Sequence, residues 1–311
     1  MELAPIVLFC YNRPQHTLKV LQALQKNVWA DQSTLYIFSD GAKLNADENT
    51  KQKIEETRCI IRQEKWTKEV HIIEQATNKG LANSIIDGIT DVINKHGRII
   101  VLEDDTMPSI GFLKFMNEAL ELYKDDEKVM NISGYLYPIQ EHDLKETTFF
   151  SRIAAGWGWA TWKRAWDKYN HDIDYHISKI NGNNEQYIFE INGASSHFQQ
   201  LIDNKNGKIY TWGIRWYASW FNADGLNLFP SISLIKNIGF DGTGENCGNE
   251  DLFHSPVTDF VEIKKIPTVE NNDLREKISN YFKSIQPPKA TPSFSTKLRM
   301  IIHKIRQKIV Q

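Results

Sequence analysis

The chain has 311 residues, of which 41% are hydrophobic and 24% charged, a usage typical of soluble globular proteins and unlike that of disordered or collagen-like chains. Its net charge of −2 is uneven, because residues 289–311 carry six Lys and Arg and no acid, which leaves about −8 elsewhere and excludes a nucleic-acid-binding body. No apolar run reaches the roughly 20 residues that cross a bilayer, and no basic segment precedes the apolar run 4–10 as in a signal peptide. Three cysteines without metal-ligand spacing suit a reducing compartment, so we expect a cytoplasmic protein.

The first third of the chain alternates β-rich runs with segments of helical period, which predicts parallel strands joined by helices. Strands are expected at residues 4–10, 35–38, 70–73 and 98–102. Helices are expected from Pro14, over about 47–65, and over 81–97, where an apolar stripe ends in a basic residue and a glycine. Each strand ends in polar residues, and this carboxyl edge is where open α/β sheets bind ligands.

From about residue 131 the strand-like runs shorten, and seven of the nine tryptophans fall within residues 157–220. Aromatic faces suit the C–H patches of sugars, but tryptophan also builds cores, so both interpretations stay open for each ring. The pattern predicts a division into residues 1–130, residues 131–270 of the same domain, and a linker with a basic C-terminal segment at 271–311.

Three acids in a row, Glu103-Asp104-Asp105, follow the fourth strand. Their mutual repulsion would be relieved by Mg²⁺ or Mn²⁺, which prefer carboxylate, water and diphosphate oxygens. The alternative is that Asp105 or Thr106 merely caps a helix starting near Pro108. We therefore predict a divalent metal site, with helix capping as the competing interpretation.

Three segments carry a resemblance to a known family: Cys10-Tyr11-Asn12-Arg13, Phe38-Ser39-Asp40-Gly41 and Val101-Leu102-Glu103-Asp104-Asp105. They resemble the nucleotide-sugar half of GT-A fold glycosyltransferases, most of all the N-acetylglucosaminyltransferase that starts N-glycan branching and bacterial family 2-like sugar transferases. The resemblance extends through Gly156-Trp157-Gly158-Trp159 to Asn237-Ile238-Gly239-Phe240-Asp241-Gly242, over residues 4–250. It implies an α/β, Rossmann-like GT-A fold with a mixed, mostly parallel sheet flanked by helices, an acceptor-side subdomain and a C-terminal amphipathic helix.

The resemblance also implies roles for individual residues. Asp105 would coordinate the metal, Asp104 would contact the ribose or sugar, Asp40 would bind the nucleoside, and Arg13 beside Tyr11 would approach the diphosphate or base. A permanently charged arginine fork suits phosphate, and carboxylates accept hydrogen bonds from ribose hydroxyls or a uracil N–H. The alternatives are a solvated Arg13 and a plain turn at Asp40.

Further nucleotide-sugar contacts are expected from two turns. Asn78 and Lys79 precede the third helix and either face the nucleotide or form an ordinary turn, while Trp157 and Gly158 match a segment near donor sugar and acceptor in the resembling enzymes. The glycine-dense segment 240–248 matches a loop that orders over the donor in those enzymes, or is a plain surface loop.

An inverting transfer needs a carboxylate that takes the proton of the acceptor hydroxyl. The family pattern places this acid within the segment matching Trp212–Trp216, where this chain has Gly213. Asp241 and Glu245 are therefore our candidate bases, and Asp167 and Asp172 weaker ones. Because the expected acid is missing at Gly213, one alternative is a sugar-nucleotide-binding protein without transferase activity. A second alternative is a sugar nucleotidyltransferase.

The C-terminal segment has an apolar stripe through Leu298, Ile301, Ile302, Ile305 and Ile309, with basic residues beside it. This pattern predicts a basic amphipathic helix that binds an anionic membrane, or packs on the protein itself. Membrane binding would place the protein on the inner face of the membrane. There it would take a nucleotide-sugar, which the family resemblance implies is a UDP-sugar, and extend a glycan or lipid-linked glycan in surface polysaccharide or oligosaccharide synthesis.

Overall fold

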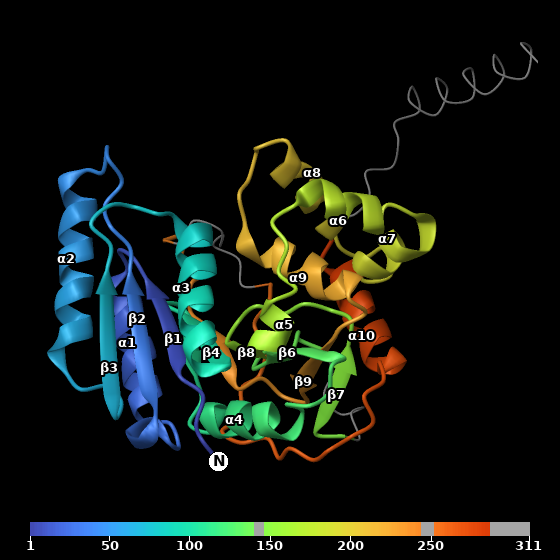
Figure 1. The fold of residues 1–311 in the computed structure, drawn as a ribbon, viewed down its shortest axis with the longest axis horizontal. Helices are drawn as coiled ribbons and strands as arrows, with labels where there is room; N and C mark the ends of the chain where they lie inside the picture. Colours follow the sequence, from blue (N-terminus) through green and yellow to red (C-terminus); the bar gives the residue numbers. More distant parts are fainter. Residues whose placement is uncertain (140–145, 244–251, 287–311) are drawn as a thin grey trace, which may run out of the picture.

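A computed structural model describes residues 1–139, 146–243 and 252–286. Its centre is an eight-stranded sheet with the order β3-β2-β1-β4-β8-β6-β9-β7, flanked by helices (Figure 1). The segment expected to form the C-terminal amphipathic helix lies outside the described residues. Within the described ranges, no helix is both long and apolar enough to cross a membrane.

The first four strands are parallel neighbours, joined by helices as the alternating pattern predicted. The strands are β1 (Ile6–Cys10), β2 (Thr34–Ser39), β3 (Glu69–Glu74) and β4 (Arg98–Glu103). The helices between them are α1 (Pro14–Gln25), α2 (Glu48–Gln63) and α3 (Leu81–His96), with a 3₁₀ turn, η1, at Ala30–Gln32. Local chemistry sets the ends: Pro14 opens α1, Asp47 accepts the Thr50 N–H at 2.7 Å, and Gly97, with φ +75°, ends α3.

Alternate residues of β1 enter different cores, as expected for a strand covered on both faces. Ile6 and Leu8 pack with α1, α2 and α4 (Phe112–Leu122), whereas Val7 and Phe9 pack with α3 and α9 (Trp212–Asn222). The sheet is thus a central layer, and the helices packed on its two faces hold its carboxyl edge in place.

The chain after the acidic triplet contradicts the alternative in which Asp105 or Thr106 caps a helix that starts near Pro108. Residues Thr106–Pro108 form strand β5, which pairs antiparallel with β10 (Ile235–Asn237), and α4 starts only after Gly111. The Thr106 hydroxyl bonds both the backbone N–H and the carbonyl of Glu103, at 2.8 Å each, so it closes the turn of the triplet. The triplet is therefore held between a strand end and a new strand pair.

The second half completes the same sheet. Strand β8 (Trp159–Trp162) lies antiparallel between β4 and β6 (Val129–Ser133), β9 (Leu226–Pro230) runs parallel to β6, and β7 (Thr148–Ser151) closes the edge. All strands of this sheet except β7 and β8 therefore share one direction, which confirms the predicted mixed, mostly parallel α/β architecture. The remaining helices are α5 (Lys163–Trp166), α6 (Ile173–Ile180), α7 (Asn183–Phe189), α8 (His197–Lys205) and α10 (Asn272–Ser284).

Helix α10 lies where the predicted division starts its linker. Its Leu274 and Ile278 are fully buried in a third core with Phe149 and Phe229 of the last two strands of the sheet. Residues up to Ser284 thus belong to the packed domain.

Candidate active site

Polar side chains gather at the carboxyl edge of the parallel strands. Strand β1 pairs with β2 on one side and with β4 on the other. The loops that carry Tyr11, Arg13, Asp40 and the triplet Glu103–Asp105 therefore leave the sheet next to one another, at the edge predicted for the donor.

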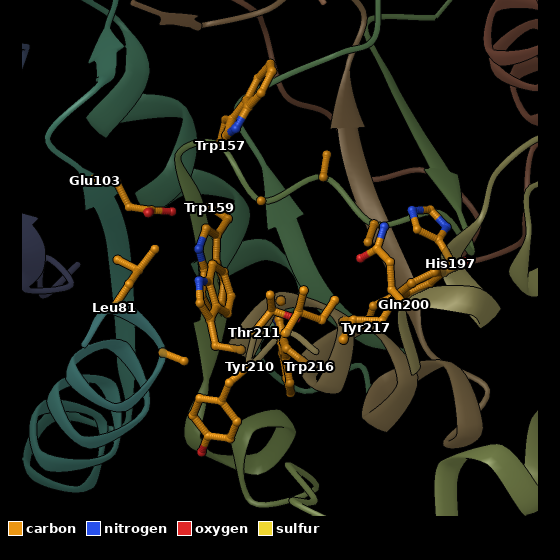
Figure 2. A pocket seen from close by; sticks show the side chains of 18 of the residues that line it. Leu81, Glu103, Trp157, Trp159, His197, Gln200, Tyr210, Thr211, Trp216 and Tyr217 are labelled. Atoms are coloured by element: carbon orange, nitrogen blue, oxygen red, sulfur yellow. The ribbon is translucent and has the colours of Figure 1, made fainter. Parts of the chain in front are cut away.

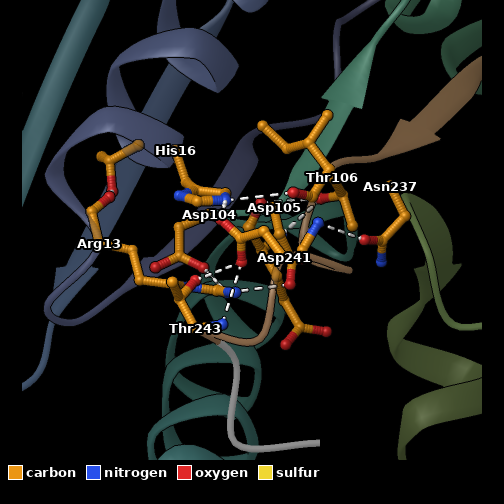
Figure 3. A network of polar contacts seen from close by, with 12 residues as sticks. Arg13, His16, Asp104, Asp105, Thr106, Asn237, Asp241 and Thr243 are labelled. Carbon is orange, nitrogen blue, oxygen red and sulfur yellow. Dashed lines mark hydrogen bonds and ion pairs between the residues drawn. The ribbon is translucent and has the colours of Figure 1, made fainter. Parts of the chain in front are cut away.

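Arg13 joins the two aspartates of the triplet (Figure 3). Its Nη2 donates to Asp104 Oδ1 and, over 2.9 Å, to Asp105 Oδ2. The Arg13 side chain is only 15% exposed, so it is not the solvated residue of the alternative interpretation. Two carboxylates thus converge on one cationic position.

This cluster holds more negative charge than Arg13 offsets. Burial, together with the charges of Asp105 and Asp104, raises the pKa of Glu103 to about 8. Burial also raises the pKa of Asp104 to about 6, although the Arg13 charge opposes that shift. A divalent cation would relieve the repulsion.

Asp104 and Asp105 fit Mg²⁺ or Mn²⁺ as a pair. Among the residues that the structure describes, no group of three or more His, Cys, Asp or Glu side chains could hold a metal ion. Mg²⁺ commonly binds through one or two carboxylates plus substrate phosphates and water. The donor set therefore fits a metal that is completed by a diphosphate.

Asp40 lies buried at the end of β2, and its carboxylate accepts four hydrogen bonds. Oδ1 accepts from the backbone N–H groups of Gly41 and Lys79, each at 2.8 Å. Oδ2 accepts from the Gly80 N–H at 2.9 Å and from Asn78 Nδ2 at 3.0 Å. Asp40 is therefore more than a plain turn residue, because it ties the end of β2 to the turn before α3, and its expected nucleoside contact stays a prediction.

A cavity of about 290 Å³ lies over this edge, and we call it the donor cavity. It brings together most of the residues predicted to bind the nucleotide-sugar or metal. Those in its lining are Tyr11, Arg13, Asp40, Asn78, Asp104, Asp105 and Trp157. Lys79 lines the neighbouring cavity instead, and its amine pairs with Asp87 at 2.9 Å.

A second cavity, of about 690 Å³, has many aromatic rings in its lining, and we call it the aromatic cavity (Figure 2). Its rings are those of Tyr137, Trp157, Trp159, Tyr210, Trp212, Trp216, Tyr217 and Trp220. Gln200 and Thr211 add uncharged polar groups, and burial lowers the pKa of His197 to about 4, so that its ring is neutral near pH 7. Apart from the Lys79 ammonium and the titratable carboxyl group of Glu103, no residue of the described lining carries charge.

The two cavities meet at a set of residues that lines both: Gly80, Leu81, Glu103, Trp157 and Trp212. Glu103 is the only acid among them, and in Figure 2 its carboxylate extends toward Trp159. No described residue donates a hydrogen bond to that carboxylate. The Glu103 carboxyl group therefore has no hydrogen-bond donor among the described residues at the place where the contents of the two cavities would touch, and it loses its proton as the pH passes its raised pKa of about 8.

The sequence predicted a metal site for the triplet as a whole and no separate role for Glu103. A signal was present, because side chains alternate along a strand and the last residue of β4 is directed away from the side taken by Asp104. The alternation alone does not show that a second cavity lies on that side, since most of its walls come from residues 131–220.

The candidate base Asp241 lies near Asp104 and Asp105 in Figure 3. Its Oδ2 is 3.2 Å from His16 Nε2, and its Oδ1 accepts from the Thr243 N–H and hydroxyl at 3.0 and 2.6 Å (Figure 3). These bonds from Thr243 lower the pKa of Asp241, and its side chain is 46% exposed. Asp241 lines neither of the two cavities, so the structure does not bring it to their junction.

The other candidate acids are not at the junction either. Asp167 pairs with Lys163 one helical turn away, and Asp172 caps α6 by accepting the Tyr175 N–H at 3.0 Å. Glu245 lies outside the described residues, as does most of its glycine-dense segment.

The tryptophans divide between core and cavity. Trp159, Trp216 and Trp220 are buried in one core, where Trp159 stacks on Trp212 with ring centroids 5.4 Å apart. Trp157 keeps partial exposure at the junction. The same rings therefore build the core and supply its cavity-facing surface.

The two glycines of interest differ in role. Gly158, with φ +57°, lines neither cavity, and a Cβ there would lie 2.5 Å from the Ile235 side chain, so it serves close packing. Gly213, where the family pattern expects the base, lines the aromatic cavity, and a Cβ there would meet nothing within 4 Å. The expected acid position is thus open space in this chain.

Comparison with known proteins gives structural matches only. No family model matches the chain, and no curated protein does. Among solved structures, the mannosyltransferase PcManGT from Pyrobaculum calidifontis, in complex with GDP-Man and Mn²⁺, matches with a TM-score of 0.41 at 11% identity, over 71% of this chain and 68% of that one. TarS from S. aureus matches with a TM-score of 0.31 at 13% identity, over 47% of this chain and 24% of that one. Likeness at this level assigns neither a family nor an activity.

Proposed function

We propose that this chain is a glycosyltransferase that moves a sugar from a nucleotide-sugar to a hydroxyl group of a glycan, with the help of Mn²⁺ or Mg²⁺. The observation that carries the proposal is the junction of the two cavities at Glu103. One cavity presents paired carboxylates and an arginine, which suit a metal-bound diphosphate, and the other presents aromatic rings, which suit a sugar. A group transfer needs two such sites in contact.

On the donor side, Asp104 and Asp105 would hold the metal, and Arg13 and Tyr11 would lie along the diphosphate. The metal would stabilise the negative charge that develops on the leaving diphosphate. Arg13 donates hydrogen bonds to Asp104 and Asp105. Its side chain is therefore within reach of a phosphate that binds beside these two carboxylates. We infer a UDP-sugar as the donor, with a hexosyl or N-acetylhexosaminyl group.

On the acceptor side, Glu103 is the described acid best placed to act as base. It would take the proton of the acceptor hydroxyl while that oxygen bonds to the anomeric carbon and the bond to the diphosphate breaks, with inversion. Its carboxylate has no competing hydrogen bond from the described residues, whereas both oxygens of Asp241 have partners. The near absence of charge in the aromatic cavity favours an uncharged saccharide, presented free or on a lipid-linked glycan.

The test is a binding and turnover screen. UDP-, GDP- and CMP-sugars are titrated by calorimetry with Mn²⁺, Mg²⁺ or EDTA, and nucleotide release is then followed with a panel of glycan acceptors. We expect metal-dependent donor binding, slow hydrolysis alone and faster release with an acceptor. Binding without turnover would favour the non-catalytic alternative, and no nucleotide binding together with an unchanged Asp105→Ala variant would refute the proposal.

A further inference from the structure

The hydrogen bonds of Asp40 bear on how the nucleobase is recognised. A carboxylate has about four lone-pair positions, and both oxygens of Asp40 accept two bonds each. A ligand N–H could bond to Asp40 only by displacing one of these donors, and three of them are backbone N–H groups of a tight turn. Asp40 is therefore suited to fix the turn at residues 78–80.

The same bonds fix the side-chain amide of Asn78. Its Nδ2 donates to Asp40 Oδ2 at 3.0 Å and to the Gly41 carbonyl at 2.9 Å. Both partners only accept hydrogen bonds, so the atom facing them must be the nitrogen. Asn78 Oδ1 is then directed away from Asp40, and it accepts no hydrogen bond from the described residues although Asn78 lines the donor cavity.

The position of Asn78 within the donor cavity indicates what it would meet. Arg13, Asp104 and Asp105 mark the diphosphate end, and Glu103 and Trp157 mark the sugar end at the junction. A third part of the lining comes from the end of β2, the loop after it, the turn before α3 and the first turn of α3, through Phe38, Asp40, Lys43, Asn78 and Ser84. If the proposed function holds, this third side receives the nucleoside.

We propose that Asn78 Oδ1 accepts a hydrogen bond from the imino N–H of the nucleobase, and that Asp40 acts as a positioning residue that holds the Asn78 amide in this orientation. Uracil carries such a donor at N3, whereas the N3 of cytosine is an acceptor and faces Asn78 Oδ1 with repulsion. Asn78 is thus the residue that selects a uracil nucleotide over a cytosine nucleotide. This inference rests on the proposed function and adds the recognition of its donor.

The experiment compares the affinities of UDP, 3-methyl-UDP and CDP by calorimetry in the presence of Mn²⁺. Loss of a single hydrogen bond to an oriented acceptor is worth about tenfold in affinity. We expect the full chain to bind UDP about tenfold or more tightly than either analogue. Asn78→Ala should bind all three alike, and the exposed Thr77→Ala, in the same turn but outside both cavities, should keep the preference for UDP.

Asp40→Ala removes both acceptor oxygens, including the one that holds the Asn78 amide. The orientation of Asn78 is then released, and the UDP preference should fall to that of Asn78→Ala. A chain that binds 3-methyl-UDP as tightly as UDP, or an Asn78→Ala variant that keeps the preference, overturns the inference while leaving the proposed function standing. Absence of binding to all three nucleotides overturns both.

Discussion

At the scale of single residues, Glu103 is the group whose surroundings best match proton transfer. We expect Glu103→Gln, which keeps the shape and removes the base, to lower the rate of sugar transfer by about 10²- to 10⁴-fold. UDP affinity in the presence of Mn²⁺ should change little, because Asp104, Asp105 and Arg13 remain. Steady-state transfer and calorimetry on the same preparation measure the two effects.

Asp241→Asn tests the alternative assignment, in which Asp241 is the catalytic base. This change removes an acid that lies outside both cavities, so it should reduce transfer much less than Glu103→Gln does. Equal or reversed losses would show that the base is not Glu103.

The raised pKa values of Glu103 and Asp104 predict how stability depends on pH. Unfolded Glu and Asp titrate near about 4.3 and 3.9, so between about pH 4 and 8 the folded chain keeps protons that the unfolded chain has released. The free energy of unfolding should therefore fall as pH rises through this window. Urea unfolding at pH 5 and pH 8, without added metal, measures the decline.

Glu103→Gln should make that decline smaller, because it removes one of the two groups. Glu121→Gln is the matched control: bonds from Lys124 and Arg98 lower the pKa of Glu121, so it does not titrate between pH 5 and 8. A decline that is the same in the Glu103→Gln variant as in the parent chain would contradict the assignment.

Local sequence could predict which residues approach the donor edge but not how their hydrogen bonds are shared. Asp40 was expected to contact the nucleoside because the family resemblance implies that role for it. Its four donors come from its own neighbour and from residues 78–80, nearly forty positions away, and such pairing depends on how the loops fold together. The chemistry was visible in the sequence, whereas the partners were not.

At the scale of elements, the predictions were best where one period governs a whole segment. Strands β1 to β4 and helices α1 to α3 lie where the apolar patterns, Pro14 and Gly97 indicated. Strand β5 was not predicted, and only the competing interpretation of the triplet gave these residues a structure, a helix start near Pro108. The strand has three residues, and its partner β10 lies more than 120 residues away. Pairing at that distance leaves no local pattern.

The glycine before β8 offers a test of close packing between elements. Gly158 and Gly207 both have positive φ, +57° and +68°, but a Cβ at Gly158 would lie 2.5 Å from the buried Ile235, whereas one at Gly207 would meet nothing within 4 Å. The shared backbone cost of alanine is about 1–2 kcal/mol, and overpacking adds about 1–3 kcal/mol. Gly158→Ala should therefore destabilise the protein more than Gly207→Ala does, as measured by urea unfolding. Equal losses would mean that Ile235 moves aside freely.

At the scale of the whole molecule, one continuous sheet carries both cavities. Strand β4 ends in the acidic triplet on the donor side, and its antiparallel neighbour β8 carries Trp159 into the aromatic cavity. A shift of one strand against the other would separate Glu103 from the aromatic wall. The division at residue 130 stays a prediction, whereas the packing of α10 shows that the domain continues beyond residue 270. The sheet explains why donor and acceptor sites would keep a fixed spacing.

The basic C-terminal segment, residues 289–311, is expected to determine whether the whole protein binds a membrane. Their six cations and apolar stripe predict binding to anionic membranes, with each Lys or Arg near the surface worth about 1 kcal/mol. Removing residues 287–311 leaves α10 complete, because that helix ends at Ser284, so the packed domain should keep its melting temperature and its UDP affinity. We expect the full chain to sediment with vesicles containing phosphatidylserine, less so in high salt, and the shortened chain to stay in the supernatant.

A full-length variant with its six C-terminal cations replaced by Gln keeps the apolar stripe and should also lose binding. Equal sedimentation of the full and shortened chains would instead favour packing of this segment against the protein.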